Sequence, residues 1–156
     1  WDNVQLGSHS IPEIFHWEGS DYPVHALAYS LDGQILISGE GDESSDTSTI
    51  RLWDTETGNI IGSITFSTQE DEGIAYPESF TFSLDGNLMG VTMGANRFIV
   101  FERESLPTDG SAVSYEETTF HAFDVGMGEV MFSPDGRFIY ANEGDVIQIW
   151  GVLADE

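Results

Sequence analysis

The chain has 156 residues, of which 40% are hydrophobic, and its 28 acidic and 4 basic residues give a formal net charge of −24 at pH 7. This hydrophobic content is enough for the core of one folded domain, but four arginines without any lysine cannot build the basic surface that binds nucleic-acid phosphates or an anionic membrane. The absence of cysteine excludes disulfides, thiol catalysis and zinc–thiolate sites, and no apolar run approaches the length that spans a membrane.

One strand candidate precedes a repeated pattern. It lies at residues 14–17, with Ile14 and Trp17 at its ends. The chain then repeats three times an apolar strand, a Ser-x-Asp-Gly turn and a second apolar strand, and the turn glycines are spaced by 53 residues (33 to 86) and 50 residues (86 to 136). A recurrence of about 40 to 50 residues in a β-rich sequence predicts the blades of a propeller.

Each turn has a local chemical explanation. The glycine can adopt the positive φ angle that a tight turn requires, and the aspartate side chain can hydrogen-bond to nearby backbone groups. Asp32, Asp85 and Asp135 are therefore predicted to be turn residues and not members of a buried network.

Further strands are predicted in chain order after each turn. Second strands are expected at residues 34–38, 87–92 and 137–141, third strands at 49–54, 97–101 and 146–150, and fainter fourth strands at 59–66 and 112–120. No helix is predicted, because Gly, Asp, Ser and Thr interrupt every candidate window. Five aromatic side chains at strand positions are expected to pack between blades: Tyr29, Trp53, Phe82, Phe132 and Trp150.

Two stretches carry a resemblance to a known family. Residues 49–58, Thr-Ile-Arg-Leu-Trp-Asp-Thr-Glu-Thr-Gly, look like the closing stretch of a WD repeat, and residues 132–136, Phe-Ser-Pro-Asp-Gly, look like its first turn. The chain thus resembles the WD-repeat β-propeller family over nearly its whole length, which implies an all-β fold with blades of four antiparallel strands. It departs from the family in lacking a Gly-His pair before the first strands and in replacing Trp-Asp with Phe101-Glu102 and Trp150-Gly151. These departures weaken the expectation of the family's buried His–Asp network.

The resemblance implies a partial propeller of about three blades. It predicts an orphan fourth strand, two complete blades and a three-stranded blade, at residues 1–20, 21–70, 71–123 and 124–156 respectively. In the WD-repeat family an N-terminal strand completes the C-terminal blade, so Ile14 and Trp17 are expected to pair beside Ile147 and Trp150. Because closed propellers have about four to eight blades, the alternatives are an incomplete ring, a strand-swapped oligomer or a piece of a longer propeller.

Four residues near the junctions between fourth and first strands are candidates for contact with a partner: Tyr22, His25, Tyr76 and Glu78. WD-repeat proteins often make partner contacts at the entrance of a first strand, where His25 lies. A lone histidine is more often a structural or surface residue, and packing can equally account for the aromatic side chains.

The long acidic loop at residues 39–48 is a candidate calcium site. Its carboxylates, Glu40, Asp42, Glu43 and Asp46, are the hard oxygen ligands that calcium prefers, although their spacing does not match an EF-hand loop. A solvated insertion without a metal is the simpler interpretation.

The sequence contains no recognisable catalytic motif. The resemblance to the WD-repeat family implies a non-catalytic protein-interaction or assembly scaffold, and we expect it to self-associate by strand complementation. The expected partners are proteins, including other copies of the chain, and neither nucleic acid nor membrane. The alternatives are a propeller enzyme or a metal or small-ligand binder that uses clustered carboxylates, or an extracellular filament subunit. An extracellular and a cytoplasmic location are both compatible with the sequence.

Overall fold

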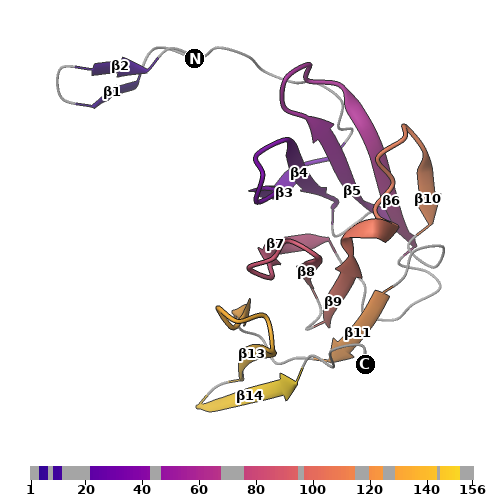
Figure 1. Ribbon diagram of the computed structural model, residues 1–156. Coiled ribbons are helices and arrows are strands. Elements are labelled where there is room, and N and C mark those ends of the chain that lie inside the picture. The colour runs from indigo at the N-terminus through magenta and orange to yellow at the C-terminus, as the bar shows by residue number, and fades with distance from the viewer. Residues whose placement is uncertain are drawn as a thin grey trace.

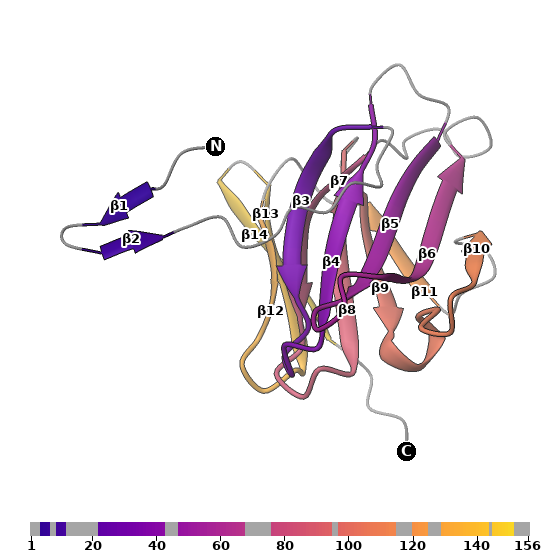
Figure 2. The same cartoon turned by 90° about the horizontal axis from the view of Figure 1, so that it is seen from above.

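The computed structural model describes residues 4–6, 9–11, 22–42, 47–67, 76–94, 97–114, 120–124, 129–143 and 145–151. In this part of the chain, strands form three sheets that fan out radially, together with a separate two-stranded N-terminal hairpin (Figures 1 and 2). The prediction of an all-β fold built from propeller blades is confirmed, and the described strands do not close into a ring. The only helical element among the described residues is the 3-10 turn η1, Arg103–Ser105, and no described helix is long and apolar enough to cross a membrane.

The N-terminal hairpin was not predicted from the sequence. It consists of β1 (Val4–Leu6) paired antiparallel with β2 (His9–Ile11). The strand predicted to complete the last blade, with Ile14 and Trp17, lies outside the described residues, so its pairing remains a prediction.

The first blade contains β3 (Val24–Tyr29), β4 (Ile35–Glu40), β5 (Thr47–Asp54) and β6 (Ile60–Ser67), which are antiparallel neighbours in this order. Burial alternates along most of β5 and β6, because successive side chains of a strand point to opposite faces of the sheet. One face of this blade packs against the second blade.

The second blade contains β7 (Pro77–Phe82), β8 (Leu88–Met93), β9 (Arg97–Glu102) and β11 (Phe120–Asp124), again antiparallel neighbours. The third blade contains β12 (Val130–Phe132), β13 (Phe138–Glu143) and β14 (Val146–Gly151). Among the described strands, none lies beside the outer edge of β14.

The prediction that residues 112–120 form the fourth strand of the second blade was wrong. The fourth strand of the second blade is β11, which pairs with β9. The strand β10 (Ala112–Ser114) instead runs parallel to β6 in the sheet of the first blade. Backbone hydrogen bonds from Gly110 N–H to Ile61 O (2.6 Å) and from Ser63 N–H to Ser111 O (3.1 Å) flank this pairing. Because β6 would otherwise expose unpaired backbone groups, pairing with β10 covers part of an open sheet edge.

Two hydrophobic clusters hold the three blades together. The cluster between the first and second blades consists of Ile37, Ile50, Leu52, Ile64, Phe66, Met89, Val91, Met93, Ile99 and Phe101. The cluster between the second and third blades consists of Phe98, Val100, Val130, Phe132, Ile139 and Ala141. The second blade is therefore the one described blade with apolar neighbours on both faces.

The five aromatic side chains predicted to lie between blades have different environments. Trp53 and Phe132 are buried, Phe82 packs half-buried against the first cluster, and Trp150 packs against the second cluster. The prediction was wrong for Tyr29, which is 60% exposed. The reason is its position on the side of the first sheet that faces away from the second blade.

Candidate protein-interaction site

The three Ser-x-Asp-Gly turns share one hydrogen-bond pattern, which confirms that their aspartates are turn residues. In the first turn, Ser30 Oγ donates to Asp32 Oδ1 at 2.6 Å, and the backbone N–H of Gln34 donates to the same oxygen at 3.1 Å. The backbone N–H of Ile35 donates to Ser30 Oγ at 3.0 Å, and the φ angle of Gly33 is 71°. The same bonds recur in the turns at Asp85 and Asp135.

These bonds lower the pKa of the turn aspartates. For Asp32, Asp85 and Asp135 the largest cause is the serine hydroxyl that donates to the carboxylate. A guanidinium hydrogen bond from Arg103 adds to the effect at Asp32, and a backbone N–H comes next at the other two. All three carboxylates are therefore ionised acceptors at neutral pH.

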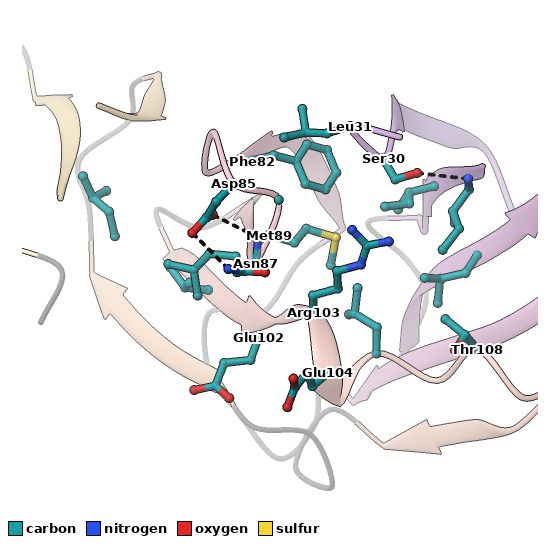
Figure 3. Close-up of a pocket in the computed structure, with 18 of the residues that line it drawn as sticks. Ser30, Leu31, Phe82, Asp85, Asn87, Met89, Glu102, Arg103, Glu104 and Thr108 are labelled. Atoms are coloured by element: carbon teal, nitrogen blue, oxygen red, sulfur yellow. Dashed lines mark hydrogen bonds between the residues drawn. The ribbon is translucent and has the colours of Figure 1, made fainter. Parts of the chain in front are cut away.

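A groove of about 1260 Å³ opens at the turn end of the blades (Figure 3). Its lining is partly apolar, with Leu31, Phe82 and Met89, and partly charged, with Glu102 and Glu104. The sequence did not reveal this groove, because its residues come from all three blades and are distant along the chain.

Arg103 also lines the groove and joins the first two blades. Its Nη2 atom lies 2.6 Å from Asp32 Oδ2. Both side chains are partly exposed, so this ion pair contributes more to the relative position of the blades than to stability.

A chain of hydrogen bonds that the sequence did not predict lies within the first blade. Trp53 Nε1–H donates to Ser38 Oγ at 2.9 Å, and Ser38 Oγ–H donates to Glu40 Oε1 at 2.8 Å. Arg51 Nη1 donates to the other carboxylate oxygen of Glu40 and forms an ion pair with it. Because Glu40 is only 1% exposed, this pairing is what makes its buried charge tolerable.

The four candidate calcium ligands do not share one environment. The Glu40 carboxylate is engaged by Ser38 and Arg51, Asp42 is half-buried, and Glu43 and Asp46 lie outside the described residues. In the described part of the chain, no group of three or more His, Asp or Glu side chains is arranged to hold a metal ion. Calcium binding by this loop remains an untested prediction.

At the opposite end of the blades from the turns, the structure brings two candidate partner-binding residues together. The rings of His25 and Tyr76 stack with centroids 3.9 Å apart and an interplanar angle of 20°. His25 Nε2 also lies 3.0 Å from the carbonyl oxygen of Gly41. The histidine is thus held between the end of β4 and the residue that precedes β7.

This contact depends on glycine at residue 41. A Cβ atom built on Gly41 would lie 2.6 Å from Tyr76 Cβ, closer than side chains tolerate. A hydrogen bond from Gly41 N–H to Pro23 O (3.2 Å) fixes the backbone of Gly41, and one from Gly94 N–H to Tyr76 O (2.9 Å) fixes the backbone of Tyr76. The first and second blades therefore meet backbone to backbone around the stacked rings.

The remaining two candidates flank this contact along the chain. Tyr22 lies just before β3 and is 43% exposed, while Glu78 is an exposed residue of β7. We call the set of Tyr22, His25, Tyr76 and Glu78 the junction site. Among these four residues, the described contact joins His25 and Tyr76, while Tyr22 and Glu78 are exposed residues near them in the chain.

Comparison with known proteins supports the fold. Residues 12–54 match a family model described as WD domain, G-beta repeat, and no curated protein sequence matches the chain significantly. The WD40 repeats of RRP9 are similar in structure with a TM-score of 0.63 at 16% sequence identity, and U3-55K with a TM-score of 0.64 at 15% identity.

Both similarities cover 86% of this chain but only 37% and 38% of the respective solved chains. The chain thus spans little more than a third of the length of these structures, and at such identities the similarity concerns the fold alone. The chain therefore carries a WD repeat at residues 12–54 and folds as antiparallel blades of the WD40 β-propeller type.

Proposed function

We propose that the chain is a non-catalytic scaffold that binds a protein partner through the junction site. The observation that carries this proposal is the stacking of His25 on Tyr76, which fixes an aromatic surface across two packed blades. WD40 repeats generally serve as protein-interaction scaffolds, so the fold agrees with this role.

The chemistry of the junction site favours a partner segment with basic and aromatic side chains. Glu78 supplies an exposed carboxylate, and the net charge of −24 attracts cationic segments over a longer range. Tyr22 supplies an amphipathic ring of the kind that often dominates binding energy at interfaces.

Binding is tested with tagged chain used for affinity purification with chemical cross-linking, followed by mass spectrometry. The test variant combines Tyr76→Ala with Glu78→Arg. The control combines Leu84→Ala with Glu56→Arg, two exposed residues at the turn end of the blades. We expect a protein that is recovered with the wild type and the control to be lost with the test variant. Equal recovery with both variants, or no enriched protein at all, would reject the proposal.

We also propose that the outer edge of β14 accepts a strand formed by residues 14–17. The first two blades each have four antiparallel strands, whereas the third has three described strands. Pairing of Ile14 and Trp17 beside Ile147 and Trp150 would complete it, within one chain or between two.

A proline substitution tests this strand. Phe15→Pro removes a backbone donor inside it and is expected to lower the melting temperature, whereas Glu18→Pro, just outside it, is the control. Equal melting temperatures of the two variants would speak against strand completion.

A further inference from the structure

Four places in the chain carry the dipeptide Asp-Gly, which is chemically reactive in proteins. They are Asp32-Gly33, Asp85-Gly86, Asp109-Gly110 and Asp135-Gly136. The backbone nitrogen of such a glycine has no neighbouring side chain to obstruct it, so it can attack the aspartate carboxyl carbon. This attack starts conversion to isoaspartate, in which the main chain runs through the side-chain carboxyl carbon. Because the attack needs a free glycine nitrogen, the hydrogen bonds at each site determine its rate.

Three of these sites are the repeated turns, where the glycine nitrogen is held inside the turn. In the first turn, the N–H of Gly33 donates to Ser30 O at 2.8 Å. The equivalent bonds of Gly86 and Gly136 are each 2.9 Å long. Each turn also joins two strands that are antiparallel neighbours in one sheet. Freeing the glycine nitrogen of a turn therefore requires that the end of a blade opens.

The fourth site lies in the loop that leads to β10, and its glycine nitrogen is held by a different blade. Asp109 and Gly110 are both exposed. The N–H of Gly110 donates to Ile61 O of β6 at 2.6 Å. The backbone N–H of Ser111 donates to Asp109 Oδ1 at 3.1 Å. Whether the Gly110 nitrogen is free thus depends on whether β10 stays beside β6.

The attachment of β10 to β6 is short (Figure 1). The strand β10 has three residues, and β6, to which it runs parallel, is its one neighbour among the described strands. Parallel pairing is slightly weaker per residue than antiparallel pairing, and segments with few neighbours open at a lower free energy than strands inside a sheet. The attachment also requires close approach of two backbones, since a Cβ atom on Gly62 would lie 1.7 Å from Pro107 O. Local opening of β10 therefore exposes an Asp-Gly site at a lower free energy than opening of a blade.

We infer that Asp109 is a site of spontaneous isoaspartate formation, and that the product releases β10 from β6. The Gly110 nitrogen attacks Asp109 Cγ and loses its proton, and a carboxyl oxygen leaves as water, which gives a cyclic imide. Water then adds to the main-chain carbonyl carbon of Asp109, and the bond from this carbon to the Gly110 nitrogen breaks. Gly110 remains attached through Cγ with no net change in atoms, so the main chain gains one methylene group ahead of β10.

The added methylene group has a structural consequence at the edge of β6. The bonds from Gly110 N–H to Ile61 O and from Ser63 N–H to Ser111 O hold β10 in one register along β6. A main chain that is longer between Pro107 and Ser111 no longer fits this register. The part of the β6 edge that β10 covers would then be open to pairing with another strand.

Ageing of the purified full chain at neutral pH, either folded or in urea, tests the inference. Isoaspartate is located by proteolysis and electron-transfer fragmentation. Its amount is measured by methyl transfer from S-adenosylmethionine with a protein isoaspartate methyltransferase. In the folded chain we expect Asp109 to react at least about tenfold faster than each turn aspartate, which corresponds to about 1.4 kcal/mol less free energy of local opening. In urea the local bonds are absent, so the four rates should become similar.

Substitutions separate the site from its attachment. Asp109→Glu should lose most of the methyl transfer, because a glutamate would have to form a larger ring, whereas the matched control Asp135→Glu should retain it. Gly62→Ala should accelerate the reaction at Asp109, since its methyl group displaces Pro107 and loosens β10. Gly151→Ala, where an added Cβ atom meets nothing within 4 Å, should leave the rate unchanged. Far-UV circular dichroism verifies that each variant is folded.

Hydrogen exchange reports the release of β10 directly. The Ser63 amide donates to Ser111 O, so its exchange should become faster in the aged wild type but not in aged Asp109→Glu. Unchanged exchange at Ser63 after isoaspartate has formed would overturn the release of β10.

The comparison of rates has its own contradicting results. A turn aspartate that reacts as fast as Asp109 in the folded chain, or no isoaspartate at residue 109, would overturn the inference. The same ranking of the four sites in urea would also overturn it, because the preference would then come from the sequence and not from the structure. These measurements use the chain alone, so they do not depend on partner binding at the junction site.

Discussion

The hydrogen-bond chain from Trp53 through Ser38 to Glu40 leads to a quantitative prediction. Ser38→Ala removes the acceptor of the indole N–H and one of the donors to the Glu40 carboxylate. Trp53 is 6% exposed and Glu40 1%, so water cannot readily replace the lost hydroxyl. The substitution therefore leaves a buried donor without this partner, while Glu40 keeps its ion pair with Arg51.

The magnitude follows from these two losses. An unsatisfied buried donor costs about 1–3 kcal/mol, and a hydrogen bond to a charged group is worth about 1.5–3 kcal/mol. Since the remaining ion pair compensates part of the second loss, we expect Ser38→Ala to reduce the free energy of unfolding by about 2–4 kcal/mol. In a Trp53→Phe background the indole donor is already absent, so the same substitution should cost about 1–2 kcal/mol less.

Urea unfolding followed by far-UV circular dichroism measures both values, at one fixed protein concentration because association would shift the apparent stability. Four chains are compared: the wild type, the two single variants and the double variant. If the effects of Ser38→Ala and Trp53→Phe add within about 0.5 kcal/mol, the two side chains are not energetically coupled and the reasoning is refuted.

Four further predictions concern the turns, the core and the acidic loop. The pKa values of the turn aspartates lie below the usual 3.8, so their contribution to folding stability is fully present above pH 3.8 and is lost as the pH falls through the folded-state pKa values. The urea concentration at the unfolding midpoint should therefore fall in acid. This fall should be smaller in variants that carry Ser→Ala substitutions in the turns. Gly33→Ala should cost about 1–2 kcal/mol because Gly33 has a φ of 71°, whereas Gly151→Ala should change stability by less than about 0.5 kcal/mol. Phe98→Ala, at a 0% exposed residue, should cost about 3–5 kcal/mol, and Leu84→Ala almost nothing. Calcium should leave the melting temperature unchanged, because Arg51 and Ser38 already engage the Glu40 carboxylate.

Each of these expectations has a contradicting result. A urea midpoint that is insensitive to acid would show that the turn bonds do not favour the ionised carboxylates. Equal costs for the two glycine substitutions would show that the positive φ angle of Gly33 does not determine the cost of adding a side chain there. A small effect of Phe98→Ala would mean that the second cluster is loosely packed. A melting temperature that rises with calcium concentration would show that the chain binds this metal and would support the acidic loop as its site.

Local chemistry explains why the three turns and most of the strands could be predicted from the sequence. In each turn, a serine, an aspartate and a glycine within four residues form their bonds among themselves and the next two residues. Strand alternation is equally local. A sequence pattern of this kind is therefore sufficient to predict the blades and their spacing.

The partners of distant segments could not be predicted in this way. The fourth-strand prediction failed because β10 pairs with the open edge of β6. The position of that edge relative to β10 depends on how the two blades pack. Glu40 was predicted as a calcium ligand because it lies in an acidic loop, but Arg51 across the sheet engages its carboxylate. Similarly, residue type suggested His25 and Tyr76 separately, and only the packing of two blades stacks them.

The sequence alone thus determined the repeat, its turns and the all-β character of the chain, since those follow from bonds between near neighbours. Tertiary structure decided which side chains are buried, and it left Tyr29 and Ile147 exposed at the two ends of the fan. The physical reason is that burial depends on whether another sheet covers a face, and a strand carries the same apolar pattern whether or not that sheet is present.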